Sequence, residues 1–179
     1  LELGEAFPGD LTINNTGAPG DDQIITTGDS EVQGDLTIAN GTLLIGDGTR
    51  MTVGGNITVQ NGAGLQIDGG GELILSNGSS LTVDLGGTLT LVGTGAKNAI
   101  VTSTGTGDAY TVTINGTVGA RYYSFSRLGG NGVTINSGAT IDGTNHFQNG
   151  VFSYPVTGAT TFLRLFRAIP TNAMDNMVF

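Results

Sequence analysis

The chain contains no cysteine and only four prolines among its 179 residues. Without cysteine it can form neither disulfides nor thiolate metal sites, although this absence identifies no cellular compartment. It also lacks any run of about 18 apolar residues, so the sequence predicts no membrane-spanning helix. The first residues, LELGEAFPGD, have neither the basic nor the apolar region of a signal peptide. Leucine at position 1 is expected of a processed chain or of an excised fragment.

Positive charge is scarce and unevenly placed. Six lysines and arginines stand against 15 aspartates and glutamates, for a net charge of −9. This balance argues against nucleic acid and anionic membrane surfaces as partners, because both are negatively charged. Residues 1–96 carry a net charge of −11 and residues 97–179 a net charge of +2. Opposite ends of this kind could attract each other head to tail, although solvated loops explain the pattern more simply.

Glycine is abundant, at 32 residues, but has no Gly-X-Y period, which excludes collagen. Few charges and many β-branched residues argue against disorder. Between Gly55 and Gly95 an apolar, middle, apolar triplet returns every eight residues. The first and third residues of such a triplet share one face of a β-strand, and the glycines between triplets leave no room for an amphipathic helix. Triplets begin at Leu11, Leu36, Leu43, Met51, Ile57, Leu65, Leu73, Leu81, Leu89, Val112 and Val133.

Short strands in series can form an antiparallel sandwich or a parallel β-solenoid. Triplets of three residues with near-constant spacing favour the solenoid, because sandwich strands are longer. Ile57 lies 21 residues after Leu36 and 24 before Leu81. The sequence therefore predicts an all-β fold, a right-handed parallel β-helix with three short strands per coil of about 21–24 residues. A two-faced coil of about 16 residues fits residues 55–95 equally well but fits the flanks worse.

The whole chain, residues 1–179, is predicted to be one solenoid domain. About seven or eight coils would give a rod of roughly 35 to 40 Å. Residues 1–96 form regular acidic coils, and residues 97–179 form wider, aromatic-richer coils. In TTFLRLFRAIP a strand is favoured over a helix, and Pro170 ends either element. Turns are expected at the Asn-Gly pairs that begin at Asn40, Asn61, Asn77, Asn115, Asn131 and Asn149.

Catalysis on this fold would need clustered carboxylates or a basic residue beside acidic ones. Four acids of the first half are candidates, but most lie in glycine-rich corners and are better explained as solvated turn residues. His146, the sole histidine, lies near Asp142 and Asn145 and could line a groove with arginines from other coils, although a packing or surface role is the simpler explanation. The candidate acids are Asp47, Asp68, Glu72 and Asp84, and the candidate arginines are Arg121, Arg127 and Arg164.

Three possible binding sites each have a simpler structural explanation. An acidic cluster could hold calcium, but it lacks the EF-hand spacing, so an acidic loop is favoured. Aromatic residues of the second half could stack on sugars, but core packing is favoured. Threonines at the middle of many triplets suggest an ice-binding array, but Leu44, Gln66 and Ile74 interrupt them. The acidic cluster is Asp21, Asp22, Asp29 and Glu31; the aromatics are Tyr122, Tyr123, Phe125 and Tyr154; the threonines are Thr37, Thr52, Thr58, Thr82, Thr90, Thr113 and Thr134. No catalytic residue, cofactor or metal site is predicted.

The segments GDLTIANGTLLIGDG, GGNITVQNGAGLQIDGGGELIL and GGNGVTINSGATIDGTNHFQNGVF resemble the repeats of large bacterial secreted and surface proteins with right-handed parallel β-helices, such as autotransporter passengers and filamentous adhesins. The resemblance extends from Gly34 to about Phe152. It implies an exported protein that serves as a stalk, adhesin, sheath or filament, while some relatives on this fold cleave polysaccharides. The fold alone does not choose among these functions.

The sequence favours a non-enzymatic protein, an extracellular or cell-surface rod. Its expected partners are other copies of the chain, stacked head to tail, or flanking coils of a longer chain, because neither LELGEAFPGD nor NAMDNMVF resembles a cap. Two alternatives remain open. An adhesin would bind a glycan or cell surface through the aromatic half, and a polysaccharide lyase or hydrolase would use Asp142, His146 and Arg121. No nucleic acid partner and no membrane insertion are expected.

Overall fold

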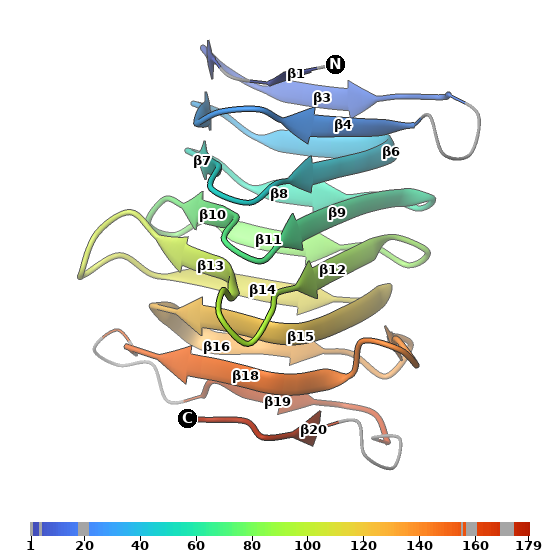
Figure 1. Cartoon of the computed structure of the whole chain (residues 1–179), viewed down its shortest axis with the longest axis vertical. Helices are drawn as coiled ribbons and strands as arrows, with labels where there is room; N and C mark the ends of the chain where they lie inside the picture. The colour runs from blue at the N-terminus through green and yellow to red at the C-terminus, as the bar shows by residue number, and fades with distance from the viewer. Residues whose placement is uncertain (1, 4, 18–21, 155, 157–160, 169–173) are drawn as a thin grey trace.

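A computed structural model of the chain describes residues 2–3, 5–17, 22–154, 156, 161–168 and 174–179. These residues form 20 β-strands and contain no helix. Every pair of neighbouring strands is parallel, and the strands stack as a β-solenoid of about six turns with the N-terminal coils at one end and the C-terminal coils at the other (Figure 1). The predicted all-β parallel solenoid is confirmed.

Most of the strands are short, as the triplets predict, and the longest ones, β6 and β15, each contribute to two faces. They are β1 (Glu2–Leu3), β2 (Ala6–Phe7), β3 (Leu11–Asn14), β4 (Gln23–Thr26), β5 (Ser30–Val32), β6 (Leu36–Ile45), β7 (Arg50–Val53), β8 (Ile57–Val59), β9 (Ala63–Asp68), β10 (Glu72–Leu75), β11 (Ser80–Val83), β12 (Thr88–Val92), β13 (Ala99–Ser103), β14 (Tyr110–Ile114), β15 (Thr117–Ser126), β16 (Leu128–Ile135), β17 (Thr140–Ile141), β18 (Phe147–Ser153), β19 (Leu163–Leu165) and β20 (Met174–Asp175).

The strand registers define three faces. Face 1 stacks β3, the first part of β6, β8, β11, β14, β16 and β19. Face 2 stacks β1, β4, the second part of β6, β9, β12, the first part of β15, then β17 with the start of β18, and β20. Face 3 stacks β2, β5, β7, β10, β13, the second part of β15, the rest of β18 and Val178. The coil is therefore three-sided, and the two-faced alternative is wrong.

The length of a coil varies along the rod. The step from Leu36 to Ile57 is 21 residues and that from Ile57 to Leu81 is 24. The step from Leu81 to Val112 is 31 residues, and that from Val133 to Leu163 is 30. Two of the six steps from β3 to β19 thus contain longer connections between their strands, and these six steps make about six turns. The partial coils at both ends bring each face to seven or eight layers, in agreement with the seven or eight coils that the sequence predicts.

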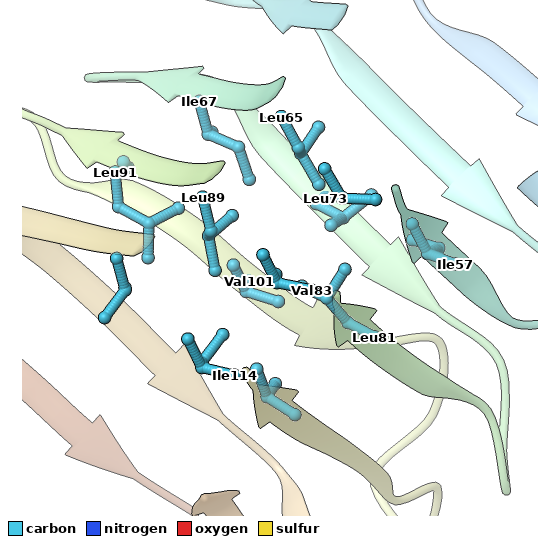
Figure 2. Close-up of a cluster of buried hydrophobic side chains, with 14 of the residues drawn as sticks. Ile57, Leu65, Ile67, Leu73, Leu81, Val83, Leu89, Leu91, Val101 and Ile114 are labelled. Atoms are coloured by element: carbon cyan, nitrogen blue, oxygen red, sulfur yellow. The ribbon is translucent and has the colours of Figure 1, made fainter. Parts of the chain in front are cut away.

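The core runs along the axis of the solenoid as one continuous cluster from Ile13 to Phe152. In each regular coil every face contributes two inward apolar residues, for example Leu36 with Ile38, Leu43 with Ile45, and Met51 with Val53, all fully buried. Figure 2 shows such residues of neighbouring coils, among them Leu65, Leu89 and Ile114, pointing into the shared interior. Each apolar residue packs on its counterparts in the coils above and below, which is why the triplets must recur.

Glycine and asparagine form the corners, but only part of the turn prediction holds. Asn61-Gly62 and Asn77-Gly78 are turns in which glycine has a positive φ. Asn40, Asn131 and Asn149 instead lie inside the strands β6, β16 and β18, so the turns predicted at these three positions are not formed. Asn115 lies at a bend after β14, next to Gly116. A solenoid corner needs only one or two residues of left-handed or bent backbone, so a strand can continue through it without a separate hairpin turn. The predicted strand in TTFLRLFRAIP is confirmed as β19, and Pro170 lies outside the described residues.

Candidate functional site

The core is open at both ends of the rod. The hydrophobic residues that are only partly buried yet pack on the core belong to the end coils: Phe7 and Leu11 at one end, and Phe162, Leu163, Leu165, Met174 and Met177 at the other. The strands there, β1, β2 and β3 against β19 and β20, pair on one side only within the described part of the chain. Apolar side chains and unpaired strand edges therefore coincide at both end faces.

Aromatic residues cover much of the C-terminal end face. Phe179 stacks on buried Phe152, with 5.4 Å between ring centroids, and Phe162 lies 6.0 Å from Phe152. Phe166, Val178 and Phe179 remain 55%, 59% and 66% exposed. A further layer of apolar residues placed on this end would remove the exposed part of the Phe179 ring from water, which is favourable by about 25 cal/mol per Å² of apolar area.

A pair of adjoining hollows marks the corner between faces 2 and 3, and two ion pairs lie in it. Both hollows are lined by Gly48, Gly70 and Ile100. Lys97 Nζ lies 2.6 Å from Asp47 Oδ2, and Arg50 Nε lies 2.7 Å from Glu72 Oε2. The hydrogen bond and charge of Glu72 raise the pKa of Arg50. Each of these cations therefore has a carboxylate partner, and Asp29, which also lines one hollow, leaves one carboxylate in excess.

The four acids considered for catalysis are not brought together. Asp47 and Glu72 line that corner and are paired with Lys97 and Arg50. Asp68 accepts a hydrogen bond from Gln66 Nε2 at 2.9 Å, and Asp84 lies beyond β11 on another corner, between faces 1 and 2. Two carboxylates acting on one glycosidic bond must face each other across the sugar, which this placement does not provide.

The acidic cluster considered for calcium is dispersed in the described residues. Asp29 Oδ1 accepts a hydrogen bond from the Arg50 backbone N–H at 3.1 Å. Glu31 points outward from β5, and Asp22 precedes β4. Asp21 lies outside the described part of the chain. Among the residues that can be searched, no group of three or more histidine, aspartate or glutamate side chains is placed to hold a metal ion.

His146 belongs to a turn that packs on face 2. Its Nε2 lies 2.5 Å from the carbonyl oxygen of Gly143. Asp142 Oδ1 accepts the backbone N–H groups of Thr144, at 2.8 Å, and Asn145, at 2.6 Å, so this carboxylate is used to close its own turn. This arrangement is an Asx turn, in which the aspartate side chain accepts hydrogen bonds from the backbone N–H groups of the residues two and three positions later.

The three arginines considered as partners of His146 lie on different parts of the rod. Arg121 ends the face 2 part of β15 and lies over the ring of Tyr122 at 5.9 Å. Arg127 follows β15 and donates from Nη1 to the carbonyl oxygen of Ser103 at 3.0 Å. Arg164 lies on face 1, where Nη1 donates to Asn131 Oδ1 at 2.6 Å. The groove that would combine Arg127 and Arg164 with His146 is not formed.

The aromatic residues considered as a sugar platform are divided between core and surface. Tyr123 and Phe125 are fully buried and make edge-to-face contact, with 5.7 Å between centroids. Tyr122 is half-buried, and Tyr154 is 76% exposed. Tyr122 precedes the face 3 part of β15 whereas Tyr154 follows β18, so the two lie at opposite edges of face 3. Core packing, the interpretation favoured from the sequence, applies to Tyr123 and Phe125.

The threonine array is more regular than the sequence indicates. Six threonines of face 1 are successive partners in the strand registers, and the three interrupting residues lie elsewhere: Leu44 and Gln66 on face 2, and Ile74 on face 3. The prediction that these residues interrupt the threonine array is therefore wrong. They belong to other faces of the solenoid, and the threonines of face 1 form an unbroken column. The column is Thr12, Thr37, Thr58, Thr82, Thr113 and Thr134, followed by Arg164.

The neighbours of this threonine column are acidic and amide side chains. Asp35 precedes the first part of β6, and its Oδ1 accepts the backbone N–H of Asn56 at 2.6 Å. On the other side, Asn136 Nδ2 donates to Asn115 Oδ1 at 2.7 Å. These bonds join successive coils along both edges of face 1. The column is thus part of a rigid polar face, and the carboxylates beside it differ from the uniform hydroxyl and methyl surface that the ice-binding hypothesis requires.

Two buried tyrosines have raised pKa values. Burial raises the pKa of the Tyr110 hydroxyl, which donates to the carbonyl oxygen of Val101 at 2.8 Å. Burial also raises the pKa of Tyr123, whose hydroxyl is buried without a hydrogen-bond partner among the described residues. Removing water from a phenol disfavours its anion, so both hydroxyls are held in the neutral form.

No family model matches this chain, and neither the curated proteins nor the solved structures contain a significant match to it. Within the described residues, no helix is long and apolar enough to cross a membrane. The evidence for function is therefore the fold and the chemistry of its surfaces.

Proposed function

We propose that this chain is a structural β-solenoid, a segment of an extracellular or cell-surface rod whose ends are covered by further coils. The observation that carries the proposal is the open core at both end faces. A solenoid that ends in the solvent is normally capped by polar or charged structure, because terminal coils otherwise expose strand edges and apolar residues. Here Leu163, Leu165 and Met177 remain partly exposed at one end, and Phe7 and Leu11 at the other.

The internal organisation supports a structural role. One continuous core uses inward residues from nearly every strand. On the surface, the ion pairs Arg50–Glu72 and Lys97–Asp47 join different coils, and Asp142 closes its own turn. The resemblance to bacterial surface repeats supports the extracellular location and the stalk, adhesin or filament class. The further coils belong either to other copies of the chain or to flanking parts of a longer chain.

Electron microscopy of the purified chain across a salt series tests the filament form of this proposal. Filaments one rod wide are expected, longer at low salt and shorter at high salt, because attraction between the acidic and basic ends is screened over about 10 Å at 0.1 M salt. Single short rods at every salt concentration would contradict a self-assembling filament. A glycan-binding screen would then test the adhesin alternative through Tyr154, the most exposed aromatic residue among those described.

A further inference from the structure

The three faces of the rod do not hold the same number of layers. In the described residues, face 1 has seven layers, from β3 to β19. Face 2 has eight, from β1 to β20, and face 3 has eight, from β2 to Val178. The chain visits face 1, face 2 and face 3 in that order in every coil. It therefore enters the rod on face 2 at β1 and reaches face 3 in residues 177–179.

This offset decides how a second copy can continue the rod. A copy placed in the same orientation would put its β1 below β20 and its β2 below residues 177–179. Face 1 would then lack one layer between β19 and the β3 of the copy. A copy turned by one face about the rod axis instead puts β1 below β19, β2 below β20 and β3 below residues 177–179. In that arrangement all three open edges are paired.

We propose that the C-terminal end of one chain binds the N-terminal end of a second copy turned by one face, with residues 177–179 pairing in parallel with β3. This inference rests on the proposed structural function and identifies the partner. The turn is compatible with the core because each face contributes two inward apolar residues per coil, such as Leu36 with Ile38 on face 1 and Met51 with Val53 on face 3.

The backbone groups at the proposed joint are complementary. The N–H of Leu11 donates to the carbonyl oxygen of Asp35, so Leu11 and Ile13 bond toward β6 and the peptide groups of Thr12 face the open side. At the other end, Val178 donates to Gly150 and accepts from Phe152, so the groups of Met177 face the open side. A parallel pair with Met177 opposite Leu11 and Val178 opposite Thr12 therefore matches donors with acceptors.

The side chains match in the same register. Leu11 and Ile13 point inward at the N-terminal end, where Ile13 is only 4% exposed. Met177 packs on the core at the C-terminal end, and Phe179 stacks on buried Phe152. Apolar residues would therefore meet apolar residues inside the joint, while Thr12 and Val178, which is 59% exposed, would lie side by side on the surface.

Charge favours head-to-tail over tail-to-tail contact. The N-terminal half, residues 1–96, has a net charge of −11, and residues 97–179 have a net charge of +2. Glu5 and Asp10 are exposed at the acidic end, and Arg164 and Asp175 are exposed at the other. Two C-terminal ends brought together would oppose their arginines, whereas the head-to-tail joint brings opposite charges together.

Disulfide trapping tests the joint, because the natural chain has no cysteine. In the variant Thr12→Cys/Val178→Cys, the two cysteines lie at opposite ends of one rod, so any disulfide between them joins two chains. Neighbouring strands are about 4.8 Å apart, which lies within the range of about 4.4–6.8 Å between Cα atoms that a disulfide spans. Oxidation should give dimers, trimers and longer oligomers that reductant returns to monomers.

The matched control is Thr82→Cys/Val178→Cys, which moves the first cysteine along the same threonine column to the middle of the rod. It should give no such series. A second comparison, Ala6→Cys/Val178→Cys, reports whether β2 lies directly below residues 177–179, as it would in a copy of the same orientation, and should also give none. Circular dichroism of all three variants checks that they remain folded, as expected for substitutions of outward residues.

The outcomes separate this joint from the proposed function. An oligomer series confined to the Thr12/Val178 variant supports the turned joint. Oligomers from the Ala6/Val178 variant would overturn it, because β2 would then lie on face 3 below residues 177–179 without any turn. If the Thr12/Val178 variant behaves like its Thr82 control while the unmodified chain forms filaments, the joint is wrong and the structural function stands. If neither oligomers nor filaments form, both the joint and the filament function are contradicted.

Discussion

The phenol ring of Tyr123 occupies the space that a side chain at position 150 would need. A Cβ atom built on Gly150 would collide with Cζ and the hydroxyl of Tyr123, which lies on the preceding coil in the same column. The ring also makes edge contacts with Phe147, at 5.3 Å, and with Phe152, at 6.0 Å. The Tyr123 side chain thus fills space in its own layer and in the layer of Gly150. Glycine is required at position 150 because the tyrosine ring leaves no room for a side chain there.

Gly150→Ala is therefore expected to destabilise the fold by about 1–3 kcal/mol, the usual cost of overpacking a core. Chemical denaturation followed by circular dichroism would measure this. Combining it with Tyr123→Leu should give a double variant whose loss is smaller than the sum of the two single losses, because the smaller residue leaves room for the methyl group. Simple additivity would show that the two residues do not compete for space.

Tyr123→Phe should leave stability unchanged or raise it by about 1 kcal/mol, because it removes a buried hydroxyl that has no partner among the described residues. Tyr110→Phe is the matched control. It removes a hydroxyl that donates to the carbonyl oxygen of Val101, leaves that oxygen unpaired, and should cost about 1–3 kcal/mol. The unfolding free energy of each variant would be compared with that of the unmodified chain. Equal changes in the same direction for both variants would contradict this prediction.

Stability should fall above about pH 10, the ordinary pKa of tyrosine. Burial raises the pKa of Tyr110 and Tyr123, so in this range the unfolded chain loses their protons while the folded chain keeps them. The stabilisation is fully present below the unfolded pKa and is lost as pH rises toward the folded values. Each group contributes a slope of about 1.4 kcal/mol per pH unit.

Melting temperatures measured from pH 8 upward would test this loss. The double variant Tyr110→Phe/Tyr123→Phe should show a shallower fall than the unmodified chain, since neither position can then lose a proton. An unchanged slope would assign the alkaline sensitivity to other groups.

Gly70 and Gly48 form a second matched pair, at the corner that carries Asp47 and Lys97. Both have positive φ, +93° at Gly70 and +75° at Gly48, so alanine at either should cost about 1 kcal/mol. A Cβ at Gly70 would also collide with Asp47 Oδ1, whereas one at Gly48 meets nothing within 4 Å. Gly70→Ala should therefore be the more destabilising substitution in thermal melts, and equal losses would show that the Asp47 side chain simply moves aside.

Lys97→Met should change the unfolding free energy by less than about 1 kcal/mol, because the ion pair with Asp47 is exposed on both sides and screened by solvent. The two side chains are 55% and 56% exposed. Denaturation at low and high salt provides the check: any difference between Lys97→Met and the unmodified chain should shrink as salt rises. A large loss that is independent of salt would indicate that the aliphatic part of Lys97 supports the fold.

Much of the fold could be predicted because the pattern that encodes it is local. Leu36, Thr37 and Ile38 alternate inward, outward and inward, and the glycine-rich segments between such triplets exclude helices. The spacing from Leu36 to Ile57 to Leu81 then gave a coil of three faces. The longer spacing after Leu81 could not be predicted, because no local pattern reveals how far a loop extends before the next strand pairs.

The surface could be predicted less well. Leu44, Gln66 and Ile74 looked like interruptions of the threonine series until the registers placed them on other faces. Tyr122 and Tyr123 are adjacent in sequence, but the left-handed backbone at Tyr122, with φ of 51°, turns the chain so that one ring is half-exposed and the other fully buried. Lys97 forms an ion pair with Asp47, which lies 50 positions earlier in the sequence. The two side chains meet over Gly70, where any side chain would collide with them.

The sequence by itself determined the strands, their parallel stacking in a three-sided solenoid and the apolar identity of the core, because these depend on alternation and spacing within one coil. Only the tertiary structure decided which outward residues share a column, which aromatics lie in the core and which layer each face carries at the ends of the rod. Those features depend on how residues more than 20 positions apart come into register, since each coil packs on the next and the lengths of the connecting loops set the alignment.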